Sequence, residues 1–160
     1  MARIAFWRIS GLARFGPLLA VLWALLAPLP ARAQEPVFNS RNGTAIEGYD
    51  VVAYFTAGAP QPGKPEHAVI WKGAVWQFVS PEHREMFEAN PRAYAPQYGG
   101  YCAFGVSQGM ILHTDPDVWQ IRGGKLYLIH NPSVWVQWVE DVPGNIARAN
   151  ANWPRVLAAR

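Results

Sequence analysis

The stretch AVIWKGAVWQFVSPEHREMFEAN (residues 68–90) decides the fold. Its first half contains two apolar runs, 68–71 and 75–79, and the pair Lys72-Gly73 stands between them. Short runs rich in Val, Trp and Phe on either side of a turn pair are typical of an antiparallel hairpin. The first half therefore predicts two paired strands joined by a tight turn.

The second half of the stretch predicts a helix that follows the hairpin at once. Ser80 is a favoured N-cap residue, and Pro81 suits the first helical position. We therefore expect a helix over residues 82–90, with Met86 and Phe87 facing the core. The proline that comes after Asn90 would end this helix, because the residue before a proline is disfavoured in helical conformation.

The same layout returns further along the chain, where Gly124 takes the place of Gly73. Its parts are strand 119–122, turn 123–124, strand 126–129, the cap Asn131-Pro132 and helix 133–140, which would bury Val134, Trp135 and Trp138. A last helix is expected over residues 145–157, and Pro154 would end or kink it. The pattern predicts an α+β fold, a small single domain of short antiparallel hairpins and helices. Two hairpin-plus-helix units would surround one core. Either an internal duplication or a chance likeness between two capped helices explains the repeat, and both interpretations stay open.

Residues 1–33 have the pattern of a secretory signal peptide. A basic start without acidic residues precedes an apolar run over 17–29, which is shorter than the roughly 20 residues that a membrane span needs. Small residues two apart then predict cleavage after Ala33. The sequence thus predicts a periplasmic or secreted protein, with no membrane span once the signal is removed. The basic residues of the start are Arg3, Arg8 and Arg14.

Removing residues 1–33 changes the charge of the chain. The whole chain has 14 basic and 11 acidic residues, net +3, and the signal segment takes four arginines and no acid with it. Ten basic residues against eleven acidic ones give the mature chain a net charge of −1. A basic surface for nucleic acid is therefore not expected. The polar stretch 34–45 predicts a flexible N-terminal arm, and residues 46–157 predict the globular domain.

Cys102 is the single cysteine of the chain, so no intramolecular disulfide can form. A lone cysteine is most often a small buried hydrophobe, but it can also be a soft metal ligand. It lies with Met110 and His113 in one glycine-rich segment that could fold back on itself. Sulfur combined with imidazole suits copper first and other transition metals after it. The predicted metal ligands are Cys102, Met110, His113 and His83.

Two other functions stay open. Aromatic side chains beside the glycine-rich loop could line a pocket for a small ligand, or a surface for a protein partner, without any metal. The candidates for that pocket are Tyr98, Tyr101, Phe104, Trp71, Trp76 and Trp119. A thiol-dependent enzyme would use Cys102 as a nucleophile activated by His113 or His83. The sequence contains no Ser-His-Asp order, paired-carboxylate motif or phosphate loop, so we expect a binding protein rather than an enzyme.

Several segments together resemble the YHS domain family, and more narrowly its exported, signal-peptide-bearing bacterial members. They are residues 48–55, 76–87, 90–94, 98–103, 143–146 and 151–154. The resemblance implies a small α+β fold, with the YHS-like domain over 46–157. It also implies a metal site, since metal-associated members of the family are taken to bind metal through cysteines in D-P-V-C and F-C-S-x-x-C segments. The matching positions here are Ala53, Val79 and His83, of which only His83 can ligate.

Overall fold

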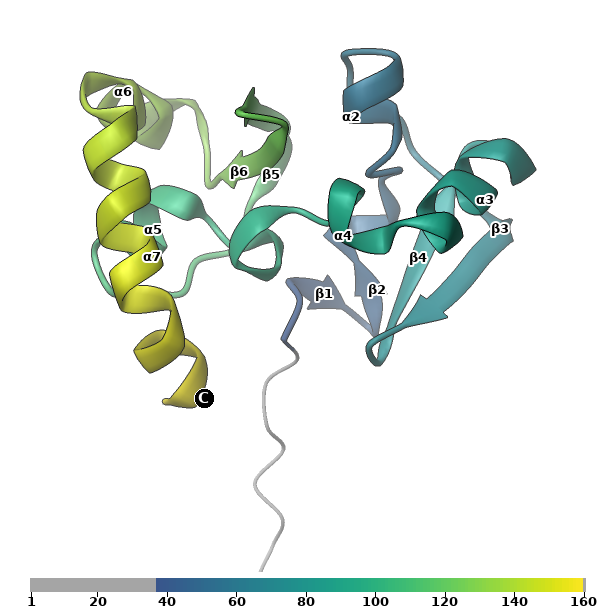
Figure 1. The fold of residues 1–160 in the computed structure, drawn as a ribbon, viewed down its shortest axis with the longest axis horizontal. Coiled ribbons are helices and arrows are strands. Elements are labelled where there is room, and N and C mark those ends of the chain that lie inside the picture. Colours follow the sequence, from purple (N-terminus) through teal and green to yellow (C-terminus); the bar gives the residue numbers. More distant parts are fainter. Residues whose placement is uncertain (1–36, 160) are drawn as a thin grey trace, which may run out of the picture. The chain divides into compact units, whose positions relative to one another are not determined.

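The computed structural model describes residues 37–159 (Figure 1). The predicted signal peptide, residues 1–33, lies outside the described residues. Across 37–159 no helix combines the length and the apolar character that crossing a membrane requires. In chain order the elements are β1 (Ser40–Arg41), β2 (Thr44–Ala45), η1 (Ile46–Gly48), α2 (Ala53–Thr56), β3 (Lys64–Trp71), β4 (Ala74–Phe78), α3 (Pro81–Ala89), α4 (Pro91–Tyr94), η2 (Gln97–Gly100), α5 (Ala103–Ser107), β5 (Asp115–Arg122), β6 (Lys125–Ile129), α6 (Pro132–Glu140) and α7 (Val142–Ala158).

The strands form two small sheets, and the fold class is α+β as predicted. The four-stranded sheet has the order β1-β2-β4-β3, and the two-stranded sheet is the hairpin of β5 and β6. In the first sheet β2 runs parallel to β4, with Thr44 opposite Val75, while the other pairs are antiparallel. The sequence predicted the two hairpins, and both are confirmed.

Both hairpins turn through two residues with left-handed backbone. The φ angles are 48° and 80° at Lys72 and Gly73, and 58° and 69° at Gly123 and Gly124. Positive φ at both central residues is the requirement of the two-residue turns that match the twist of paired strands. The glycines at these positions adopt that backbone with little strain.

Each hairpin leads into a capped helix. Ser80 Oγ accepts the backbone N–H of His83 at 3.3 Å, and Asn131 Oδ1 accepts that of Val134 at 2.9 Å. Pro81 and Pro132 begin helices α3 and α6, as predicted.

The faces of these two helices were predicted in part, with errors on both helices. Phe87 and Trp138 are fully buried, as the sequence indicated. Met86 was expected in the core but is 37 % exposed, because its neighbour Phe87 takes the inward position. On α6, Trp135 was also expected to be buried and is only partly so.

The core consists of two clusters that meet across β6. Leu126 and Leu128 belong to a first cluster with the four-stranded sheet, and Tyr127 and Ile129 belong to a second cluster with the C-terminal helices. Because successive side chains of a strand point to opposite faces, β6 has one face in each cluster. The single core that the sequence suggested is therefore divided by a strand buried on both sides.

Residues 37–45 correct the prediction of a flexible arm. They form β1 and β2, and Phe38 and Asn39 are 6 % and 3 % exposed. The Asn39 amide nitrogen donates to Gly100 O at 3.1 Å and to Thr114 Oγ1 at 2.8 Å. The polar composition of this segment indicated an arm because these partners are 61 and 75 residues away in sequence.

Two turns of left-handed backbone, η1 and η2, contact each other. Ile46, Glu47 and Gly48 all have positive φ in η1, and Tyr98, Gly99 and Gly100 do so in η2. A Cβ atom at Gly100 would meet the Ile46 side chain, which shows how closely the turns pack. Left-handed backbone is costly for a β-branched residue such as Ile46. The packing against η2 stabilises it there.

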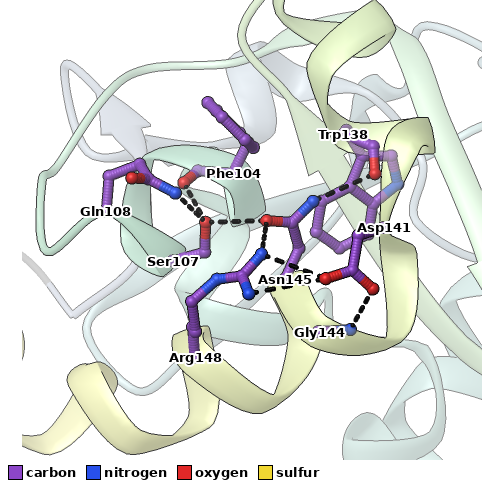
Figure 2. A network of polar contacts seen from close by, with 8 residues as sticks. All are labelled: Phe104, Ser107, Gln108, Trp138, Asp141, Gly144, Asn145 and Arg148. Carbon is purple, nitrogen blue, oxygen red and sulfur yellow. Dashed lines mark hydrogen bonds and ion pairs between the residues drawn. The ribbon is translucent and has the colours of Figure 1, made fainter.

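The C-terminal helices are held by a buried amide, shown in Figure 2. Asn145, 2 % exposed, donates to Trp138 O at 3.1 Å and accepts from Ser107 Oγ at 3.3 Å. Its side chain thus joins α7 to the end of α6 and to α5. Asp141 caps α7 by accepting the Gly144 N–H at 2.9 Å, so this helix begins earlier than the predicted 145–157 segment. The helix also continues through Pro154, which was expected to end or kink it.

Candidate functional site

Cys102, the first predicted metal ligand, is buried in the second cluster and fully shielded from solvent. It stands at the N-cap of α5, and its sulfur accepts the Gly105 N–H at 3.4 Å. Burial raises the pKa of the Cys102 thiol, which favours the protonated form. A thiolate is the form that acts as nucleophile or metal ligand, so this environment opposes both roles.

Met110 and His113 lie at the surface near the backbone of Cys102. Met110 is 50 % exposed, and His113 is exposed as well. The Cys102 N–H donates to Leu112 O at 3.0 Å, so the segment does fold back as predicted. The Nδ1 atom of His113 lies 2.6 Å from Asn39 Oδ1.

His83 has a different set of contacts. Its Nδ1 lies 2.6 Å from Asp50 Oδ2, and its Nε2 lies 3.3 Å from Thr56 Oγ1. Asp50 is completely buried and also accepts three backbone N–H groups, those of Val52, Ala53 and Val79. The Asp50 carboxylate thus ties α2 to the junction of β4 and α3, and it fixes the orientation of the His83 ring.

The predicted ligands are not gathered into one site. Among residues 37–159 there is no group of three or more His, Cys, Asp and Glu side chains placed to hold a metal ion. His83 contacts Asp50 and Thr56, whereas Cys102 lies in the second cluster. The four predicted ligands therefore do not together surround one copper ion. The copper site stays a prediction.

Most of the aromatic side chains that were candidates for a pocket belong to the core. Trp76, Tyr98 and Tyr101 are buried, and Trp71 and Phe104 pack against the two clusters. Trp119 lines a pocket. Its ring packs against Tyr54, with ring centroids 5.2 Å apart in a T-shaped arrangement.

The pocket lies between β5 and α6. Its lining residues are Asp117, Val118 and Trp119 from β5, and Pro132 and Trp135 from α6, around a volume of about 240 Å³. Two indole rings, a proline and a valine make the lining mostly apolar, with one carboxylate among them. Small-ligand sites have this composition, apolar walls with a few polar groups that set orientation.

Carboxylates concentrate at the β5 side of the pocket. Asp115 Oδ1 accepts the Asp117 N–H at 2.9 Å. In the described part of the chain neither carboxylate forms an ion pair with a Lys, Arg or His side chain. The pKa of the Tyr54 hydroxyl is raised, first by burial and then by the charge of Asp117. The pocket therefore carries a negative charge that no ion pair within residues 37–159 neutralises.

The two pocket tryptophans differ from the core tryptophans in their hydrogen bonds. Trp76 donates its indole N–H to Trp71 O at 3.1 Å, and Trp138 donates to Gln120 Oε1 at 3.0 Å. From residue 37 to residue 159 no acceptor is found for the indole N–H of Trp119 or of Trp135. These two donors can bond to water or to a ligand.

An apolar stripe continues from the pocket along the outer face of α6. Pro132 and Trp135 line the pocket, and Val136 and Val139 are 60 % and 44 % exposed. These residues are spaced as neighbours on one face of a helix. Exposed apolar residues next to a pocket are more typical of a binding surface than of a plain exterior. The sequence assigned Val134, Trp135 and Trp138 to the core and gave no sign of this stripe.

A second concavity has a different character. It measures about 350 Å³ and is lined by Arg41, Asn42, Thr44, Glu47 and Gln77. Its charged groups already pair with each other, since Arg41 and Glu47 lie 3.2 Å apart. The pocket between β5 and α6, where apolar walls meet an unpaired carboxylate, is the better candidate for a ligand site.

Comparison of the chain with protein-family models, with curated proteins and with solved structures gave no significant match. The resemblance to the YHS family therefore stays a prediction. The functional argument rests on the residues and their geometry.

Proposed function

We propose that this chain is an exported, non-enzymatic binding domain whose ligand site is the pocket between β5 and α6. The observation that carries the proposal is the lining of that pocket, where Trp119 and Trp135 face a volume of about 240 Å³ beside the unpaired Asp117. Export is supported by the signal pattern of residues 1–33. The proposal favours metal-free ligand binding, which the sequence analysis left open, over the predicted copper site.

The position of Trp135 supports the proposal because the fold holds it there. Helix α6 is fixed by its Asn131 cap at one end and by the bond from Asn145 to Trp138 O at the other. A side chain on a helix secured at both ends is a preorganised wall, which reduces the entropy that binding would cost. The indole N–H groups of both pocket tryptophans remain available to a ligand.

A fragment screen by two-dimensional NMR tests the pocket. We expect apolar and aromatic fragments to shift the indole N–H signals of Trp119 and Trp135, with dissociation constants in the range of about 0.1–10 mM for ligands of this size. Trp135→Ala should weaken binding by about tenfold or more, since it removes one wall. The matched control is Gln137→Ala, an exposed residue on the same helix that lines neither the pocket nor the apolar stripe.

Thermal unfolding of both variants shows that each remains folded. Equal binding by Trp135→Ala and the parent protein would contradict the proposal. Shifts confined to residues outside β5 and α6 would contradict it as well.

A second candidate function, copper binding, is favoured by one observation at His113 and His130. Asn39 Oδ1 lies 2.6 Å from His113 Nδ1, and His113 O lies 2.8 Å from His130 Nδ1. Oxygen acceptors at both positions place the proton of each neutral ring on Nδ1 and leave Nε2 as the basic nitrogen. Metal-binding histidines are commonly oriented in this way. Both rings are exposed, and Met110 is a third exposed donor in the same segment.

Native mass spectrometry of protein purified without chelator and titrated with Cu(I), Cu(II) and Zn(II) tests the metal. One metal ion per chain that is lost in His113→Ala and His130→Ala, but kept in Cys102→Ala and His67→Ala, is the result expected of this site. No stoichiometric metal, or equal retention by all four variants, would exclude it.

A further inference from the structure

The charge of the pocket between β5 and α6 indicates what kind of ligand it takes. Asp117 is exposed and lines the pocket. The Asp115 carboxylate lies close to it, because it accepts the backbone N–H of Asp117. Both carboxylates lack an ion-pair partner within residues 37–159. An anionic ligand would be repelled here, whereas a cation would gain the electrostatic attraction that the protein itself leaves unused.

The aromatic side chains that line the pocket also favour a cation over an anion, by a second mechanism. The face of an indole ring is electronegative, and tryptophan is the strongest aromatic partner for a cation. Recognition of quaternary ammonium groups by aromatic side chains is the best known use of this attraction. Trp119 and Trp135 come from two different elements, β5 and α6, so they line one volume from two sides.

The apolar groups and the volume limit the cation further. A bare metal ion or an unsubstituted ammonium group would leave Val118 and Pro132 in contact with water or empty space. Methyl groups on the nitrogen would cover these side chains while keeping the positive charge. A volume of about 240 Å³ has room for a small alkylated cation such as choline.

We infer that the pocket between β5 and α6 binds an alkylated ammonium group, held between Trp119 and Trp135 and attracted by Asp117. The inference rests on the proposed function, because it names the ligand class of the same pocket. Asp115 contributes to the attraction through its charge and orients Asp117 through the backbone. The exposed Val136 and Val139 follow Pro132 and Trp135 at helical spacing on α6, so an apolar continuation of the ligand along this face would contact them.

The test compares choline with its neutral carbon analogue, in which a tert-butyl group replaces the trimethylammonium group. The two have nearly the same shape, so a difference between them measures the charge. We expect choline to shift the Trp119 and Trp135 indole signals with a dissociation constant of about 1 mM, and the neutral analogue to bind about 5–30-fold more weakly. Equal or tighter binding of the neutral analogue would overturn the inference.

Two variants separate the contributions of the ring and the carboxylate. Trp135→Leu keeps an apolar wall and should weaken choline about 5–30-fold, with a smaller effect on the neutral analogue. Asp117→Asn should weaken choline about 3–10-fold and reduce the salt dependence of binding. The matched control is Glu85→Gln, which removes the same charge from an exposed position on α3 and should leave binding unchanged.

The outcomes distinguish this inference from the proposed function. If aromatic fragments bind in the pocket but choline does not, the ammonium inference fails and the binding function stands. If neither binds, both fail.

Sedimentation with phosphatidylcholine vesicles shows whether the alkylated ammonium group belongs to a lipid or to a soluble molecule. Retention on vesicles that free choline reverses supports a lipid headgroup, and choline binding without retention supports a soluble ligand.

Discussion

Asp50→Ala is expected to lower the free energy of unfolding by about 3–5 kcal/mol, the largest effect of any single carboxylate in the domain. The Asp50 side chain is completely buried and accepts the N–H groups of Val52, Ala53 and Val79 as well as bonding to His83 Nδ1. Alanine would leave these donors without a partner in the interior. Urea unfolding followed by tryptophan fluorescence measures the loss.

The control for this prediction is Asp141→Ala. Asp141 caps α7 through the Gly144 N–H, but its side chain is about half exposed and water can replace it. A cost of about 1 kcal/mol is expected there. Similar losses in the two variants would show that Asp50 acts only as a helix cap and not as the link between α2, β4 and α3.

Gly99→Ala is expected to cost about 2–5 kcal/mol. Gly99 has a φ of 63°, where a side chain adds about 1–2 kcal/mol of strain. A Cβ atom at Gly99 would also meet the backbone carbonyl oxygen of Val37, and backbone cannot move aside as a flexible side chain can. The clash would displace residues 37–39 from η2, where Gly99 O accepts the Asn39 N–H at 2.7 Å.

Gly109→Ala separates the clash from the strain. Gly109 has a φ of 78°, but no atom lies within 4 Å of the place where its Cβ would stand. Only the cost of left-handed backbone, about 1–2 kcal/mol, is expected in this variant. Thermal unfolding of both variants checks the difference. Equal melting temperatures would mean that the approach of Val37 to Gly99 adds nothing to stability.

The sequence predicted the elements that local chemistry determines. The turn pairs at Lys72-Gly73 and Gly123-Gly124 and the caps at Ser80 and Asn131 depend on neighbouring residues alone, and each was confirmed. The flexible arm was wrong because Asn39 finds its partners 61 and 75 residues away. No local pattern distinguishes an asparagine with distant partners from one that is solvated.

The candidate site was harder to predict than the fold. The sequence placed Trp119 among the pocket candidates, and it does line the pocket. Trp135 was assigned to the core because it lies on the apolar side of an amphipathic helix pattern. Such a pattern gives the average direction of a face, and it does not tell whether another element covers the residue at the edge. The Asn131 cap secures the start of α6, and the bond from Asn145 to Trp138 O secures its end. The apolar pattern of the helix does not indicate the Asn145 contact.

The long separation between Asn39 and its partners sets an order of events during synthesis. Thr114 is added 75 residues after Asn39, which takes about 4–15 s at ordinary rates of translation. Until then the Asn39 side chain lacks one of its two partners, and Leu126 and Leu128, which share a core cluster with Phe38, are added later still. Residues 38 and 39 therefore cannot complete their native contacts until most of the domain has been synthesised. The first segment of the fold to be made is among the last to reach its final position.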